Sequence, residues 1–216
     1  MIAIIDKKLI DYEAAWKLQQ KKFNLALQQK KAGETPKQYL FLCEHPPVYT
    51  LGKNANEQNI VLSKEMLGAS VFKVERGGDV TFHGPGQIVG YPILDLEQLN
   101  MGLRTYIELI EETIIQVLEI YGLKGSRIKS ASGVWLDAGT PKERKICALG
   151  VKASRHITMH GFAFNVNTDL SWFQKINPCG FTDKGVTSLE KELDKKQDFE
   201  AVKKEVIKQF QKLFLK

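Results

Sequence analysis

The chain has 216 residues, of which 43% are hydrophobic and 26% are charged, and its net charge is +6. These values fit one globular domain and exclude collagen, low-complexity disorder and a coiled coil. The modest basic excess favours an acidic partner without identifying nucleic acid as that partner. No apolar run approaches the roughly 18 residues of a membrane span, and the N-terminal apolar run is too short for a secretory signal, so a cytosolic protein is expected.

The first half of the chain predicts one helix and several short strands. Asp11 can cap a helix that ends near Gly33 and Pro36, because apolar residues follow it at helical spacing. These residues are Tyr12, Trp16, Phe23 and Leu27. Short apolar runs then predict strands at 38–43, 48–52, 71–74 and 88–96, with a glycine-rich loop over 76–87.

The second half predicts a strong amphipathic helix over 105–121, followed by strands at 133–137, 145–151 and 156–166. Gly161 interrupts the alternation of the last strand, which indicates a bulge or a close approach of another backbone. A basic amphipathic helix is expected over 198–216. Runs of strands with inserted helices indicate an α+β fold, and the absence of a linker-like stretch favours a single domain over 1–216.

The segment 75–87 reads Glu-Arg-Gly-Gly-Asp-Val-Thr-Phe-His-Gly-Pro-Gly-Gln. Its four glycines let backbone N–H groups approach a ligand, and Arg76 can hold an anionic or carbonyl group. The spacing fits neither a phosphate loop nor a dinucleotide-binding fingerprint. A hairpin loop with turn glycines is the alternative interpretation.

The three cysteines are far apart and include no Cys-x-x-Cys pair, so we expect neither a disulfide framework nor a zinc knuckle. This cysteine usage favours a protein of a reducing compartment. Cys179 lies between Pro178 and Gly180, in a turn where a thiol can be exposed and reactive. The alternative is a small buried hydrophobe, and this is the expectation for Cys43 and Cys147, which lie in apolar runs.

The remaining candidate residues are one lysine and the histidines. Lys145 opens an apolar strand and is either a solvated loop charge or an amine that the strand carries into a site. His156 and His160 have a spacing that suits a metal on a helix, but the pattern predicts a strand, so no metal is expected. His83 and His160 are candidates for hydrogen bonds in a polar pocket, and His45 is expected to be structural.

Taken together, the motifs resemble the lipoyl(octanoyl) transferase family, the octanoyl-[acyl-carrier-protein]:protein N-octanoyltransferases. The matching segments occur in family order at 44–52, 76–87 followed by Tyr91, 145–150, 160–166 and 176–180. The resemblance implies a biotin/lipoate protein ligase-like α+β domain with mixed sheets flanked by helices. The C-terminal helix is the part of the chain that the resemblance covers least.

The resemblance also implies a reaction and its site. Such an enzyme moves an octanoyl group from octanoyl-acyl carrier protein to a lysine of lipoyl domains in 2-oxoacid dehydrogenase E2 subunits and glycine cleavage H protein. Cys179 would carry the acyl thioester, and Lys145 would act as general acid and base. No cofactor, metal, nucleic acid or membrane is implied, and we expect a monomer. The implied substrate-binding positions are Arg76, Gly77, Gly78, Asp79, Val80, Thr81, Phe82, His83, Ala148, Leu149, Gly150, Gly161, Phe162 and Ala163.

Two alternatives stay open from the sequence. An ATP-dependent lipoate or biotin protein ligase on the same fold would have a similar glycine loop but would need no cysteine nucleophile. A non-catalytic basic module for acidic proteins or nucleic acid would explain the net charge of +6 but would leave Lys145 and Cys179 without a role.

Overall fold

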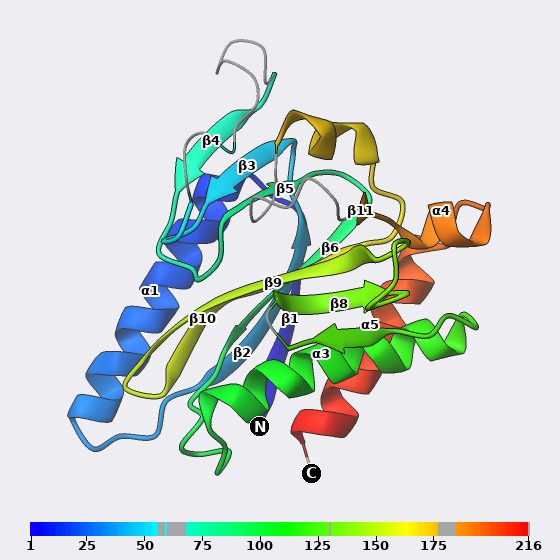
Figure 1. The fold of residues 1–216 in the computed structure, drawn as a ribbon. Coiled ribbons are helices and arrows are strands. Elements are labelled where there is room, and N and C mark those ends of the chain that lie inside the picture. Colours follow the sequence, from blue (N-terminus) through cyan, green and yellow to red (C-terminus); the bar gives the residue numbers. More distant parts are fainter. Residues whose placement is uncertain (56–58, 60–67, 130, 177–184, 216) are drawn as a thin grey trace.

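The computed structural model describes residues 1–55, 59, 68–129, 131–176 and 185–215 (Figure 1). This part of the chain forms a large mixed sheet and a small three-stranded sheet, with helices packed around them. The large sheet has the strand order β1-β2-β6-β10-β9-β8-β7, and β11 pairs with β9 outside this path. Its strands are β1 (Ile2–Leu9), β2 (Gln38–Glu44), β6 (Gln87–Ile93), β7 (Ser126–Ile128), β8 (Ala131–Leu136), β9 (Arg144–Ser154), β10 (Ile157–Asn165) and β11 (Gly185–Val186).

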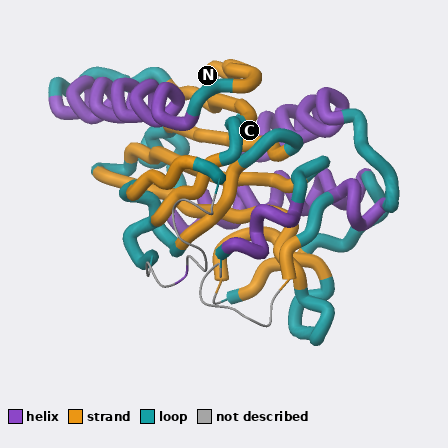
Figure 2. Tube along the Cα trace, turned by 90° about the horizontal axis from the view of Figure 1, so that it is seen from above, coloured by secondary structure: helices purple, strands orange, loops and turns teal. Residues whose placement is uncertain are grey.

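The small sheet and the helices complete the arrangement. Strands β4 (Ser70–Lys73), β3 (Val48–Leu51) and β5 (Val80–His83) form the small sheet in that order. Figure 2 shows this arrangement from above, with the long first helix beside the strands. The helices are α1 (Tyr12–Lys31), α3 (Leu103–Ile120), α4 (Leu189–Leu193) and α5 (Phe199–Phe214), and η2 (Leu170–Lys175) is a 3₁₀ helix.

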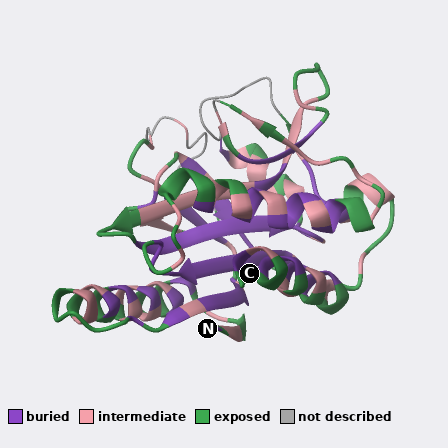
Figure 3. Cartoon of the chain, turned by 90° about the horizontal axis from the view of Figure 1, so that it is seen from below, coloured by how far each residue is buried: buried purple, intermediate pink, exposed green. Residues whose placement is uncertain are grey.

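The two faces of the large sheet are covered by different helices. Alternate residues of each strand point to opposite faces, so Phe41 and Ala163 pack with α1, whereas Leu40 and Phe162 pack with α3 and α5. Figure 3 shows the strands of the sheet as the buried centre, with exposed positions on the outer sides of the helices. The α+β class expected from the sequence is confirmed.

The expected helices form where local signals placed them. The Asp11 carboxylate accepts hydrogen bonds from the backbone N–H groups of Glu13 and Ala14, which caps α1. Asp198 caps α5 by accepting from the N–H of Ala201. None of the described helices is long and apolar enough to cross a membrane.

Several elements were not expected from the sequence. The N-terminal run forms β1, which pairs in parallel with β2, and β5 lies inside the predicted glycine loop because it pairs with β3. The short elements β7, β11, η2 and α4 were also not predicted. At Gly161, β10 pairs with β9 without a register shift, so the predicted bulge is wrong there. The predicted close approach is confirmed, because a Cβ at Gly161 would overlap the carbonyl oxygen of Gly90 on β6.

Candidate active site

A cavity of about 640 Å³ lies where the glycine-rich segment meets β9 and β10. Lys145 and thirteen of the fourteen predicted substrate-binding residues line it. They come from three places: segment 76–83 without Phe82, positions 148–150 of β9, and positions 161–163 of β10. The fold therefore brings together segments that lie far apart in the sequence.

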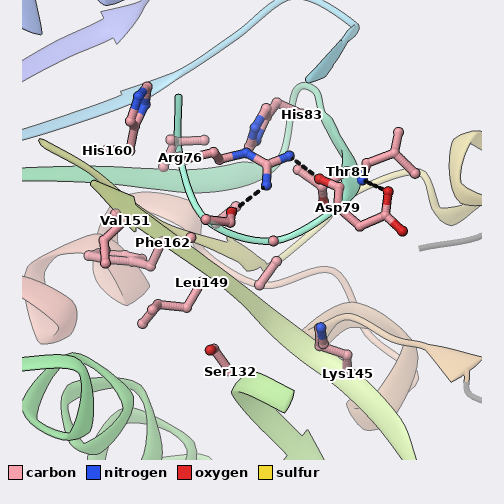
Figure 4. A pocket seen from close by; sticks show the side chains of 18 of the residues that line it. Arg76, Asp79, Thr81, His83, Ser132, Lys145, Leu149, Val151, His160 and Phe162 are labelled. Carbon is pink, nitrogen blue, oxygen red and sulfur yellow. Dashed lines mark hydrogen bonds between the residues drawn. The ribbon is translucent and has the colours of Figure 1, made fainter. Parts of the chain in front are cut away.

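Arg76 shapes the glycine-rich segment from within. Its guanidinium is nearly buried, with the residue 8% exposed, and it donates hydrogen bonds to the carbonyl oxygens of Thr50 and Asp79, each at 2.7 Å. It also donates to the carbonyl oxygen of Gly77 at 3.0 Å. The carbonyl groups that Arg76 holds are thus the protein's own, two in the glycine-rich segment and one on β3, and Arg76 lines the cavity (Figure 4).

The segment is also attached to the edge of β9. The N–H of Gly77 donates to the carbonyl oxygen of Val151 at 2.9 Å. Gly150 faces this junction, and a Cβ there would lie 2.7 Å from the carbonyl oxygen of Gly77. The missing side chain at 150 therefore makes room for the neighbouring backbone, because a Cβ atom essentially never approaches an oxygen so closely.

Lys145 faces the cavity because of an irregularity between β8 and β9. Val134 is opposite Cys147, but Trp135 is opposite Lys145, so Ile146 is one extra residue on β9. Ile146 and Cys147 consequently both pack in the core on the α3 side, while Lys145 lines the cavity together with Ala148. Figure 4 shows Lys145 and Ser132 on one side of the cavity, and Arg76 and Asp79 on the other.

Buried polar side chains at the end of segment 76–83 and on β6 and β10 form part of the cavity wall. The His83 Nδ1 lies 2.9 Å from Oε1 of Gln87, whose amide nitrogen donates to Asn165 Oδ1 at 2.9 Å. Because the Gln87 oxygen must accept, Nδ1 of His83 carries the proton. Burial lowers the pKa of His83 to about 3, with the charges of His45 and Arg76 acting in the same direction. The pKa of His160 is also lowered to about 3, chiefly by burial.

The other histidine predictions have different outcomes. His45 is fully buried, and its Nδ1 lies 2.7 Å from the carbonyl oxygen of Ile10, while its Nε2 lies 2.8 Å from the Tyr91 hydroxyl. These contacts confirm the expected structural position. His156 is exposed and His160 is buried in the cavity wall, and the described residues contain no group of three or more metal-ligating side chains.

Phe82 is the predicted substrate-binding residue that does not line this cavity. Its ring is 1% exposed and stacks on Trp172, with the ring centroids 5.3 Å apart. It lines a separate cavity of about 510 Å³ together with Glu44 and Pro47. The Phe82 ring packs in the cluster of the small sheet with Tyr49 and Ile176, whereas Thr81 and His83 of the same strand line the first cavity.

Cys179 lies in segment 177–184, outside the described residues. The described chain on both sides of this segment reaches the cavity, because Phe173 and Val186 line it. Val186 pairs with Lys145 across β11 and β9, and the N–H of Thr187 donates to the carbonyl oxygen of Lys145 at 2.9 Å. Cys43 and Cys147 are buried free thiols, and desolvation raises the pKa of both, which confirms their expected character.

The cavity also contains residues for which the sequence suggested no role in a site. They are contributed by neighbouring elements, so only the packing of those elements could reveal them. The sequence pattern assigns Tyr12 to the apolar stripe of a helix, whereas Ser132 and the α3 residues carry no signal for a site. These additional lining residues include Tyr12, Leu103, Ile107, Ser132 and Val186.

Comparison with solved structures identifies the fold class of this chain. A bipartite lipoate protein ligase from Thermoplasma acidophilum has a TM-score of 0.70 at 14% identity, over 98% of this chain and 82% of that chain. A biotin protein ligase from Aquifex aeolicus has a TM-score of 0.56 at 13% identity, over 99% and 70%. The fold is thus that of the lipoate and biotin protein ligases, as predicted.

The family follows from the sequence. The Lipoyl protein ligase A/B catalytic domain matches residues 11–211. A protein from Porphyromonas gingivalis named octanoyltransferase is 55% identical over 209 residues, 95% of this chain but 42% of that protein. An octanoyltransferase from Parabacteroides distasonis is 52% identical over 209 residues, 95% of each. The chain belongs to the lipoyl protein ligase A/B catalytic domain family, which confirms the resemblance read from its motifs.

Proposed function

We propose that this protein transfers an octanoyl group from octanoyl-acyl carrier protein to a lysine of lipoyl domains, with Cys179 as nucleophile and Lys145 as general acid and base. The observation that carries the proposal is the position of Lys145, whose side chain lines the 640 Å³ cavity next to β11, the strand after segment 177–184. The names of the relatives support octanoyl transfer as the reaction.

The first half-reaction forms an acyl-enzyme. The Cys179 thiolate attacks the thioester carbonyl of the donor, a carbon–sulfur bond forms, and the bond to the carrier's sulfur breaks. A nearby ammonium group favours the thiolate by charge pairing. The Lys145 ammonium then gives its proton to the departing carrier thiolate, so that the carrier leaves as a thiol.

The second half-reaction releases the product. The acceptor lysine has an unperturbed pKa of about 10.4, so most of it is protonated near neutral pH. The acceptor ammonium first loses one proton to solvent, and the neutral amine attacks the Cys179 thioester. Neutral Lys145 takes the second proton from the attacking nitrogen, and the cysteine thiolate leaves. The product is an amide, and because transfer from a thioester to an amide is downhill, the reaction needs no nucleotide, metal or other cofactor.

The walls of the cavity suit a medium-length acyl chain. About seven apolar carbons, at about 0.8 kcal/mol each, gain roughly 5–6 kcal/mol on burial. Leu149, Phe162 and Ala163 supply apolar wall, and Gly77 and Gly150 hold the glycine-rich segment close to β9. The net charge of +6 favours encounter with acidic partners, and acyl carrier proteins and lipoyl domains are typically acidic.

The ligase alternative is the main competitor, because ligases share the fold. The structure of a ligase from Thermoplasma acidophilum was described together with its E2 lipoyl domain, which supports the lipoyl domains of E2 subunits as acceptors. The glycine cleavage H protein remains a predicted acceptor. That the protein is a cytosolic monomer also remains a prediction.

Purified protein should octanoylate a lipoyl domain from octanoyl-acyl carrier protein without ATP. Transfer only from free octanoate plus ATP would favour a ligase, and strong salt-dependent DNA retention without transfer would favour a basic binding module.

A further inference from the structure

Glu111 is a buried carboxylate outside the cavity. It lies on α3 at helical spacing from Leu103 and Ile107, which line the cavity, so it continues the same face of the helix. The residue is 6% exposed, and burial raises the pKa of its carboxyl group. A carboxylate in such a place is costly unless hydrogen bonds or an ion pair compensate it.

The first compensating contact is with the backbone of β8. Oε1 of Glu111 accepts a hydrogen bond from the N–H of Gly133 at 2.9 Å. Gly133 has a φ of +121°, in the region that favours glycine, and a Cβ there would overlap the carbonyl oxygen of Cys147. The carboxylate therefore holds a backbone position that only glycine adopts without strain.

Gly133 lies at the start of the irregularity that turns Lys145 into the cavity. It is opposite Ala148, after which Val134 is opposite Cys147 and Trp135 is opposite Lys145. The position of a Cβ on Gly133 would be 3.6 Å from Cδ of Lys145, so the backbone of Gly133 lies against the aliphatic part of that side chain. Movement of Gly133 would change both the bulge and the space that Lys145 occupies.

The second compensating contact allows a control. Nε of Arg127 lies 3.2 Å from Oε2 of Glu111, and Nη2 of the same arginine lies 2.6 Å from Oε2 of Glu112. Glu112 therefore shares Arg127 with Glu111, but the contact with Gly133 belongs to Glu111. An effect of the ion pair and an effect of the Gly133 contact can thus be separated.

We propose that Glu111 is a positioning residue for Lys145: through the Gly133 N–H it fixes the β8–β9 bulge that directs the Lys145 amine into the cavity. This inference rests on the proposed function only for its kinetic consequence. A bulge next to a site commonly re-aims a side chain, and its geometry depends on the groups that hold the backbone in place.

The test compares Glu111→Met and Glu111→Ala, which lose the acceptor, with Glu111→Gln, which keeps one, and with the control Glu112→Ala. Two quantities are measured on variants whose thermal unfolding shows a folded protein. One is kcat and KM of octanoyl transfer. The other is the rate at which an amine reagent modifies Lys145, quantified by peptide mass spectrometry relative to the exposed Lys142 of the same sample.

Loss of the acceptor should lower kcat about 10- to 100-fold with KM for the donor little changed. The Lys145 modification rate should change in the same variants, whereas Glu111→Gln restores most of kcat and Glu112→Ala behaves as wild type. The alanine variant serves if the methionine variant does not fold. Wild-type kcat and wild-type Lys145 modification in a folded Met or Ala variant would overturn the inference, as would an equal loss in Glu112→Ala. Lys145 modification needs no octanoyl transfer, so an inactive wild type would refute the proposed function while this measurement still decides the role of Glu111.

Discussion

The Nζ atom of Lys145 lies 4.5 Å from the centroid of the Trp135 ring, the residue opposite it on β8. The aromatic face attracts the ammonium group and limits the positions that the flexible lysine chain can take. Lys145 is therefore an ordered amine at the cavity wall rather than the solvated loop charge that its charged neighbours in the sequence also allowed.

Replacement of Lys145 with alanine should slow transfer by about 10²- to 10⁴-fold, the range of a lost general acid–base group. Both half-reactions should slow, because the same amine serves each. Single-turnover measurement of acyl-enzyme formation and of its consumption by a lipoyl domain checks this. Lys142→Ala, on the exposed loop before β9, is the control, and a Lys145→Ala variant with wild-type rates would return this lysine to a structural role.

The acyl group should appear on Cys179 alone when the protein is incubated with octanoyl-acyl carrier protein and no acceptor. Cys43 and Cys147 are buried, and desolvation raises their thiol pKa, so neither forms a thiolate readily. Mass spectrometry of the intact protein should show one octanoyl group that hydroxylamine removes. Cys179→Ser should abolish this hydroxylamine-sensitive adduct, and an adduct mapped to Cys43 or Cys147 would contradict the assignment.

A methyl group at position 150 should disturb the junction between the glycine-rich segment and β9. In Gly150→Ala the new Cβ would lie 2.7 Å from the carbonyl oxygen of Gly77 and 3.2 Å from Cδ of Arg76, so the segment must shift. We expect a loss of about 1–3 kcal/mol in the free energy of unfolding, together with a higher KM for the octanoyl donor.

Urea unfolding and steady-state kinetics measure these two effects. Gly102→Ala is the matched control, because nothing lies within 4 Å of a Cβ at that position. As an N-cap substitution it should cost at most about 1 kcal/mol. Equal unfolding free energies and equal KM values in Gly150→Ala and wild type would show that the junction tolerates a side chain.

The buried His83 should make stability fall in acid. Its pKa in the folded state is about 3, against about 6.5 for an unperturbed histidine, so the unfolded chain takes up the proton first as the pH falls. The stability that neutral His83 contributes is complete above pH about 6.5 and is lost between about 6.5 and about 3, by up to about 1.4 kcal/mol per pH unit.

Unfolding free energies measured by urea at several pH values between 7.5 and 5 test this sign. His83→Gln should flatten the decline, while His156→Gln, which changes an exposed histidine, should leave the decline as in wild type. A stability that rises as the pH falls below 6.5, or a decline unaffected by His83→Gln, would contradict a neutral His83 in the wall of the cavity.

Local sequence patterns predict three of the helices, most of the longer strands and the chemical inventory of this protein, but not β1, β5 or the short elements. Helices α1, α3 and α5 follow from periodic apolar residues and, for α1 and α5, from capping aspartates, because such signals act within a few residues of the chain. The motifs also indicate the family, and the site residues predicted from them make up about half of the residues that line the cavity.

How these residues face one another depends on the packing of strands and helices in space. Simple alternation along β9 would put Lys145 on the same side as Cys147, and the bulge at Ile146 places them on opposite sides. Phe82 stacks on Trp172 and lines a cavity separate from that of the other predicted substrate-binding residues. Glu111 gave no sequence signal, since its partner Gly133 is remote in the chain. Strand pairing, bulges and helix–sheet contacts depend on long-range partners, and this is why local sequence patterns could not specify them.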